Sequence, residues 1–171
     1  VNWITDFDAG GSLYVNSIVS VLNEFKLQDS PTLPFLDFKG TLSPPTTPEA
    51  PGGAYDYRLN TTVGYNFGGG RASIGVRWMH LPEVDDGARA RNPRTTVLGV
   101  GSYNLFNLFA GYQVNERISL RGGIDNLFDE DPLIVSSDPN GLTPNVNAQN
   151  TNAQYYDILG RRAYVGLKMS F

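Results

Sequence analysis

The end of the chain, residues 162–171, reads RAYVGLKMSF. Every second residue from Ala163 to Phe171 is apolar, and the residues between them are polar or glycine except for Tyr164. An alternation with a period of two is typical of a β-strand whose two faces meet different surroundings. The stretch therefore predicts a strand with one apolar face and one polar face.

Five earlier segments of the sequence alternate in the same way. One of them is less regular, because Leu105 and Phe109 fall among its polar positions. Together with the last stretch they give six expected strands, over residues 13–27, 57–67, 72–78, 106–114, 118–125 and 162–171. The repetition predicts an all-β fold in which consecutive strands form an antiparallel meander.

The connections between these segments alternate between short and long. Short turns fall at residues 66–71 and 113–117, while long connections cover 29–53, 81–102 and 129–160. Unstructured loops of this length are uncommon in a compact soluble domain. Short turns at one rim and long loops at the other are the pattern of outer-membrane barrels, whose strands of about 10 residues cross an apolar band about 25 Å tall. A soluble β-sandwich with its aromatic residues in the core is the alternative interpretation.

The composition excludes several other classes of protein. The sequence contains no run of about 20 apolar residues, which a transmembrane helix requires. Its 13 basic and 17 acidic residues include no dense Lys/Arg cluster, so nucleic acid is not an expected partner. Cysteine is absent and His80 is the one histidine, which leaves neither a thiolate site nor a multi-histidine metal site within the chain. No cofactor is expected.

No arrangement of nucleophile and base stands out in the sequence, so we do not expect an enzyme. His80 shares a face with Trp78 at the end of its strand and is interpreted as an interfacial residue, with a Ser–His hydrolase as the competing hypothesis. Acidic residues cluster at 83–86 and 129–131, and their oxygen atoms are possible ligands for calcium. Neither cluster has the spacing of an EF-hand, so we interpret them as solvated loop residues.

Three stretches in the second half of the chain, 102–112, 120–132 and 156–171, resemble the C-terminal signature of TonB-dependent receptors. The most specific feature is the order of two short motifs. They are Asp125-Asn126-Leu127-Phe128 after one strand and Gly160-Arg161-Arg162 before the last strand. The first hundred residues fit the family only through their rhythm of short turns and long loops.

The resemblance implies a barrel of about 22 strands in the outer membrane of a Gram-negative bacterium, with a plug domain in its lumen. It also implies uptake of an extracellular small ligand, driven by the inner-membrane TonB complex; the family carries iron–siderophore complexes, cobalamin and oligosaccharides. Residues 1–171 are then expected to be the C-terminal part of the barrel domain, without the plug and the N-terminal strands. A soluble all-β binding module and a self-contained small outer-membrane barrel with a structural or adhesive role are the other hypotheses.

A C-terminal phenylalanine preceded by alternating apolar residues resembles the signal that the barrel-assembly machinery reads. The expected signal consists of Val165, Leu167, Met169 and Phe171. An exposed strand edge can be recognised by adding its backbone to another sheet. The alternative is that these residues only face the lipid of the outer membrane.

Charged residues on the opposite side of the strands are expected to face the lumen. They are Arg58, Arg77, Arg121, Asp125, Arg162 and Lys168. They hold the plug or line the substrate path, or else they pair with one another across neighbouring strands. Glycines at 64, 75, 111, 123 and 166 fall on the same side, where they leave room for a plug or let the strands bend.

Overall fold

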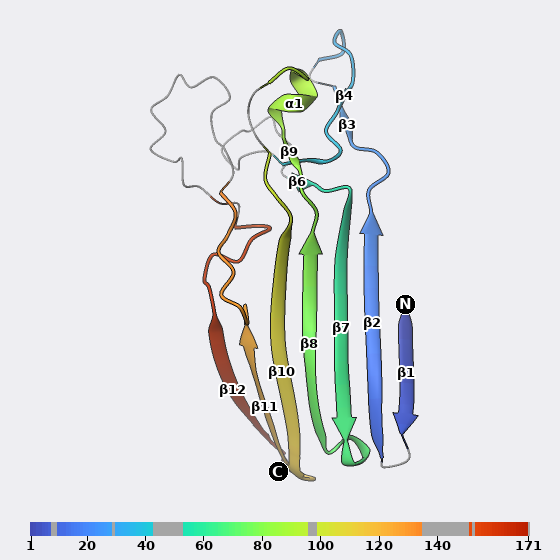
Figure 1. Cartoon of the computed structure of the whole chain (residues 1–171), viewed down its shortest axis with the longest axis vertical. Coiled ribbons are helices and arrows are strands. Elements are labelled where there is room, and N and C mark those ends of the chain that lie inside the picture. Colours follow the sequence, from blue (N-terminus) through green and yellow to red (C-terminus); the bar gives the residue numbers. More distant parts are fainter. Residues whose placement is uncertain are drawn as a thin grey trace.

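Seven antiparallel strands form one sheet in the computed structural model, which describes residues 1–7, 10–28, 30–42, 53–95, 99–134, 151 and 153–170. The strands are β1 (Asn2–Phe7), β2 (Gly11–Val21), β7 (Tyr57–Phe67), β8 (Ala72–Leu81), β10 (Tyr103–Asn115), β11 (Ile118–Asp125) and β12 (Arg162–Met169). They lie side by side in chain order (Figure 1). The predicted antiparallel meander is confirmed, and the sheet is open, with β1 and β12 at its two edges.

The connections give the sheet two unlike ends, as the sequence predicts (Figure 1). Short turns join β1 to β2, β7 to β8 and β10 to β11 at one end, which we call the turn end; the second of them contains the 3-10 helix η1 (Gly68–Gly70). The long connections leave from the other end, the loop end. They carry β3 (Lys26–Leu27), β4 (Leu36–Asp37), β5 (Thr41–Leu42), β6 (Gly53–Ala54), β9 (Asp85–Asp86) and the helix α1 (Ala88–Arg91).

The sheet has one strand more than the six segments that alternate in the sequence. Sequence reasoning misses β1, because Ile4 places an apolar residue on the polar side of this short strand. The first expected strand also ends earlier, at Val21 rather than Leu27. Beyond Val21 the backbone enters the loop, where the carbonyl of Phe25 accepts a hydrogen bond from the N–H of Phe38 (2.8 Å).

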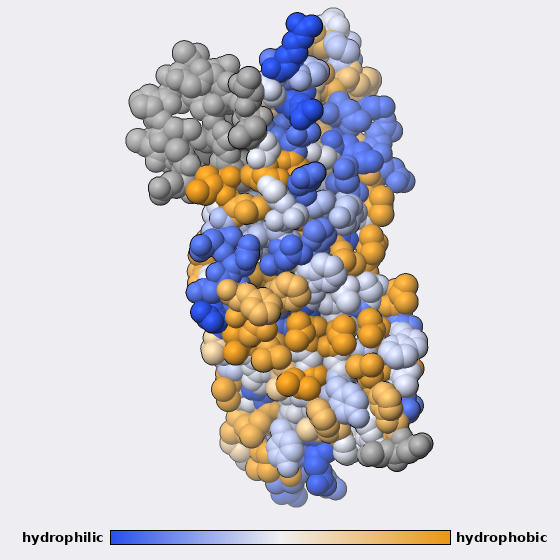
Figure 2. Space-filling view, viewed as in Figure 1, coloured by the Kyte–Doolittle hydropathy of each residue, from blue (hydrophilic) through white to orange (hydrophobic). Residues whose placement is uncertain are grey.

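The two faces of the sheet differ in character. Cross-strand register places Val15, Val63, Val76, Leu108 and Ile124 in one row of the face that we call apolar. A neighbouring row of the opposite, polar face contains Asn16, Thr62, Arg77 and Asn107. Large apolar side chains of the strands stay exposed, up to 86% for Val165, and Figure 2 shows hydrophobic residues gathered over the middle of the sheet and towards its turn end. A soluble sandwich needs a second layer over such a face, and the described residues supply none.

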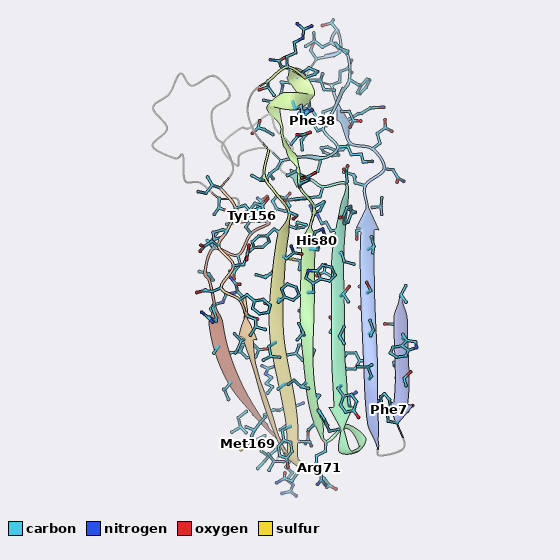
Figure 3. The ribbon with its side chains drawn as sticks, in the orientation of Figure 1. Phe7, Phe38, Arg71, His80, Tyr156 and Met169 are labelled. Carbon is cyan, nitrogen blue, oxygen red and sulfur yellow. The ribbon has the colours of Figure 1, made fainter. Side chains whose placement is uncertain are left out.

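The buried core lies at the loop end rather than against the apolar face. Its apolar members are Phe38, Leu42, Ala54, Tyr55, Leu81, Val84, Tyr103 and Tyr156. They come from all three long connections and from the loop ends of β8 and β10, and Figure 3 places Phe38 and Tyr156 at this end. Loop segments far apart in sequence are therefore packed together. Among the described residues, no helix has both the length and the apolar composition needed to cross a membrane.

Candidate functional site

The turn after β11 is built around the side chain of Asn126, which is 1% exposed. Its φ of 51° is a left-handed conformation that asparagine tolerates better than most residues. Its side-chain amide donates to the carbonyl of Glu130 (2.9 Å) and accepts from the N–H of Glu130 (2.8 Å). The N–H of Asn126 donates to Oδ1 of Asn107 in β10 (2.8 Å). Asn126 thus fixes the chain reversal and ties it to the neighbouring strand.

The Gly160-Arg161-Arg162 motif meets this turn from a distant part of the sequence. Asp129 accepts hydrogen bonds from the N–H of Arg161 (2.8 Å) and from its guanidinium group (3.3 Å). Gly160 has a φ of 70°, and a Cβ atom at this position would lie 3.3 Å from the Asp129 carboxylate. The two motifs therefore close the base of the loop between β11 and β12. The observed hydrogen bonds of Asn126, Asp129 and Arg161 hold the backbone of this turn in place.

Arg162 and Asp157 form a second link at the base of the same loop. Asp157 accepts hydrogen bonds from the guanidinium group of Arg162 (3.0 Å) and from the N–H of Leu159 (3.1 Å). Burial acts to raise the pKa of Asp157, but these hydrogen bonds outweigh it and hold the pKa below its ordinary value of 3.8. Arg162 lies opposite Asp125 in register, yet its ion pair is with the loop residue.

Register places the other expected lumen charges on the polar face of the sheet. They are Arg58, Arg77, Arg121, Asp125 and Lys168. Within the described residues, Arg77, Arg121 and Lys168 form no ion pair, so charge pairing between strands does not hold them. The polar face therefore presents exposed positive charge from its middle to its turn end.

Aromatic rings cover three of the glycines on the polar face. One cross-strand row reads Tyr14, Gly64, Gly75, Phe109, Gly123 and Tyr164. A Cβ atom on Gly64 would lie 2.3 Å from the Tyr14 ring, and one on Gly75 would lie 2.4 Å from the Phe109 ring. A ring packed flat on the backbone needs a glycine beneath it. The rings of Tyr14, Phe109 and Tyr164 therefore occupy the space above Gly64, Gly75 and Gly123.

Arg58, at the loop end of β7, lies in a notch between two tyrosines. Its guanidinium carbon is 5.2 Å from the ring centre of Tyr55 and 5.1 Å from that of Tyr155, and the two ring centres are 5.3 Å apart. The Tyr55 hydroxyl donates to the Tyr156 hydroxyl (2.9 Å), and the N–H of Gly53 donates to the Tyr155 hydroxyl (2.9 Å). The rings are therefore fixed, and each contributes a cation–π contact to Arg58.

A cavity of about 350 Å³ opens beside this notch. It is lined by Ser20, Val21, Leu22, Phe25, Gly53, Ala54, Tyr55 and Arg58. Sequence reasoning singled out Arg58 but missed the tyrosines around it. Tyr55 and Tyr156 are 101 positions apart in the sequence, and the adjacent pair Tyr155-Tyr156 was the one local signal.

His80 lies in a small polar network at the loop end of the apolar face. Its Nδ1 is 2.9 Å from Oδ1 of Asn104, and its Nε2 is 3.1 Å from the Tyr57 hydroxyl. The indole N–H of Trp78 donates to the same Asn104 oxygen (2.9 Å). The hydrogen-bonding partners of His80 in the described chain include neither a serine nor a carboxylate. The arrangement fits the interfacial interpretation and gives no support to Ser–His chemistry.

The acidic loop clusters take part in local contacts. Asp85 forms an ion pair with Arg89 (2.8 Å), and Asp86 accepts a hydrogen bond from the N–H of Ala88 at the start of α1 (2.8 Å). In the part of the chain that the structure describes, no three His, Cys, Asp or Glu side chains are grouped so that they could hold a metal ion.

The last strand, β12, pairs with β11 along one edge and leaves its other edge open. Three residues of the expected assembly signal are exposed, Val165 by 86%, Leu167 by 56% and Met169 by 53%. Figure 3 shows Met169 at the turn end of the sheet. Phe171, the fourth residue of the expected signal, lies outside the described residues.

An open antiparallel sheet with one apolar and one charged face, short turns at one end and long loops at the other is part of a membrane β-barrel. The chain belongs to the family of TonB-dependent receptors: the family model "TonB dependent receptor-like, beta-barrel" matches residues 6–127. This match confirms the resemblance that the two short motifs indicated.

Two relatives extend the comparison. The chain is 32% identical over 85 residues to the ferric enterobactin receptor PirA of Pseudomonas aeruginosa, a match covering 50% of this chain and 10% of PirA. It is also similar to the crystal structure of a mutant of the ferric enterobactin receptor PfeA of Pseudomonas aeruginosa, with a TM-score of 0.54 and 15% identity. That alignment covers 99% of this chain and 21% of the PfeA chain, and it supports the fold. The chain thus spans only a small part of each relative.

Proposed function

We propose that residues 1–171 are the C-terminal part of the barrel of an outer-membrane TonB-dependent receptor, which in full has about 22 strands and a plug domain. The observation that carries the proposal is the family match of residues 6–127 on a sheet whose edges, β1 and β12, are unpaired. In lipid such edges leave backbone groups without hydrogen bonds, so further strands must close the barrel. A self-contained small barrel finds no support in the comparisons.

Two groups of aromatic residues border the apolar face and support its contact with outer-membrane lipid. Tyr57, Trp78, Phe106 and Phe128 lie towards the loop end, and Phe7, Tyr65, Phe67 and Tyr112 lie towards the turn end. Tyrosine and tryptophan rings prefer the level of the lipid headgroups, because their apolar body and polar tip are both satisfied there, and each group contains such rings beside its phenylalanines. The apolar residues between the two groups then face the hydrocarbon.

This placement orients the rest of the sheet. The loop end is extracellular, the turn end is periplasmic and the polar face lines the lumen. There Arg77, Arg121, Asp125 and Lys168 contact the plug or line the substrate path. The open edge of β12 pairs with the first strand of the barrel, and its apolar residues, with Phe171, are read by the barrel-assembly machinery.

The proposed activity is transport of an iron–siderophore complex, energised through the inner-membrane TonB complex, and not catalysis. Both relatives are named as ferric enterobactin receptors, which favours this ligand class over cobalamin and oligosaccharides. The extracellular ligand is captured at the loop end, where residues of three long connections pack together.

Disrupting the gene in its host tests the transport function. Loss of the receptor should abolish uptake of one radioactive iron–siderophore complex, and a plasmid copy should restore it. A proton uncoupler should stop the restored uptake, because the energy comes from the inner membrane. Undiminished uptake of every iron–siderophore complex tried, together with lost uptake of cobalamin or an oligosaccharide, would replace the proposed ligand class.

A further inference from the structure

The side chain of Arg121 in β11 extends over the neighbouring strand β12, at the open edge of the sheet. Gly166 is its partner in the register, and a Cβ atom on Gly166 would lie 2.9 Å from Nε of Arg121 and 3.1 Å from its Cγ. Paired strands lie about 4.8 Å apart. The guanidinium group therefore stands over the outermost strand, one strand nearer to the open edge than its own backbone. Glycine at 166 permits this position, because a side chain there would take the same space.

The guanidinium group of Arg121 has no acceptor in the part of the chain that the structure describes. Arg121 forms neither a side-chain hydrogen bond nor an ion pair there. Asp125 is the one carboxylate on the polar face of β11 and β12. It is four residues from Arg121 along β11, which is about 13 Å at about 3.3 Å per residue. The N–H donors of this guanidinium group are therefore left for an acceptor beyond β12.

Lys168 adds a second positive charge at the same edge. It lies on the polar face of β12, two residues after Gly166 and opposite Ser119 of β11. Like Arg121, it forms no ion pair within the described residues. The polar positions of β12 are occupied by Arg162, Tyr164, Gly166 and Lys168 and include no carboxylate. The strand that pairs with β12 therefore meets unpaired positive charge on its polar side.

A residue on the adjoining strand is well placed to pair with Arg121. Residues that lie opposite each other on one face of a sheet have Cβ atoms about 4.5 to 5.5 Å apart. The side chain opposite Gly166 would thus begin beside the guanidinium group. Opposite charges in such positions stabilise a sheet and like charges destabilise it. A carboxylate matches the planar guanidinium group best, since it can accept two parallel hydrogen bonds from it.

We propose that Arg121 forms an ion pair with an aspartate or glutamate side chain of the strand that pairs with β12 and closes the barrel. The acidic residue stands on the lumen side of that strand, opposite Gly166. The inference rests on the proposed function, which requires such a strand. It adds a side-chain contact across the closure, where a charged pair also favours one register of the two strands over its neighbours.

Zero-length cross-linking identifies the partner of residue 121. The full receptor that contains this chain is purified in detergent micelles as the wild type and as Arg121→Lys. A carbodiimide then joins amines to carboxylates in contact with them, and mass spectrometry of the digested protein locates each cross-link. Arg77→Lys is the matched control, because Arg77 lies on the same face in β8 and is separated from the open edge by β10, β11 and β12.

Arg121→Lys is expected to give a cross-link between residue 121 and an acidic residue of the strand that pairs with β12. The wild type should give none at residue 121, because a guanidinium group does not react as an amine. Arg77→Lys should give none to that strand. A cross-link from residue 121 to the plug domain, or no cross-link at residue 121, would overturn the proposal.

Thermal unfolding measures whether the pair stabilises the closed barrel. Arg121→Gln should lower the unfolding midpoint by about 2 °C, and neutralising the cross-linked carboxylate should do the same. The two changes together should cost no more than one of them, because either change removes the pair. Strictly additive shifts would contradict the proposal.

Neither measurement involves transport, so the two proposals can fail separately. Normal uptake of an iron–siderophore complex without the cross-link keeps the proposed function and overturns this inference. The cross-link in a receptor that takes up no iron–siderophore complex has the opposite meaning.

Discussion

The body of the sheet and its loop end are held together in different ways. In the body, the backbone ladder joins the strands, and many side chains of the apolar face stay exposed, such as Val165 at 86%. At the loop end, buried side chains join segments that are distant in sequence. Asn126 is 1% exposed and Tyr156 is 3% exposed, and both make specific hydrogen bonds.

This difference indicates where single substitutions matter. A backbone ladder spreads stability over many bonds, so one side chain facing lipid contributes little. A buried amide that satisfies several backbone groups concentrates stability in one residue. The row of rings over glycines is an exception within the body, because there the sheet depends on the absence of a side chain.

The largest effect is expected for Asn126→Ala at the loop end. The change leaves the N–H and the carbonyl of Glu130 without their partner and puts alanine at a φ of 51°. We expect a loss of about 3 kcal/mol in the free energy of unfolding. Denaturant unfolding of the receptor in micelles measures it. Asn126→Asp keeps the acceptor and loses the donor, so its loss should be smaller; equal losses would show that the hydrogen bond to the acceptor contributes nothing.

The next effect concerns the body of the sheet. In Gly64→Ala the new methyl group collides with the Tyr14 ring, which should lower the free energy of unfolding by about 2 kcal/mol. Tyr14→Ala in the same chain should relieve most of this collision, so the two changes together cost less than their sum. Gly101→Ala is the control, since a Cβ atom there meets nothing within 4 Å. Strict additivity would mean that the ring moves aside freely.

Acidification should weaken the loop end before the body. The pKa of Asp157 is lowered in the folded chain, so its carboxylate contributes stability above the ordinary value of 3.8. That stability is lost as the pH falls through the lower folded value. Near-UV circular dichroism of the tyrosines, followed from pH 6 down to about pH 3, should change less in Asp157→Asn than in the wild type. Asp131→Asn, an exposed loop position, should behave as the wild type does.

The smallest effect is expected on the apolar face. Ser17 and Thr61 share a hydrogen bond between their hydroxyl groups (2.9 Å). Thr61→Val leaves the Ser17 hydroxyl without its partner, and we expect a loss of about 0.5 kcal/mol in the free energy of unfolding. Adding Ser17→Ala should recover this loss, because both polar groups are then gone. If the double variant were less stable than Thr61→Val alone, the Ser17 hydroxyl would stabilise the fold through more than its hydrogen bond to Thr61.

The comparison also explains what the sequence could predict. Alternation is a pattern among residues that are close in sequence. The first and last residues of β7, Tyr57 and Phe67, could therefore be predicted from that segment alone. Ile4 breaks the alternation in β1, and that strand was missed although β2 supplies its full backbone ladder.

The contacts of the loop end are of another kind. The order of the two motifs was visible, yet the partners of Asn126 were not, because one of them, Asn107, lies on a neighbouring strand. The notch around Arg58 could not be predicted from the sequence for the same reason, since its two tyrosines come from separate long connections. No period or spacing encodes a contact between residues about a hundred positions apart.

The rings of Tyr14, Phe109 and Tyr164 lie over backbone that has no side chains of its own. Long polar side chains, such as those of lysine and arginine, must give up rotamers when a passing molecule touches them. A wall made of packed rings has little such freedom to lose. In the proposed receptor, whose lumen the polar face would line, this stretch of wall would hold a passing solute only weakly, and the loop end would have to bind it.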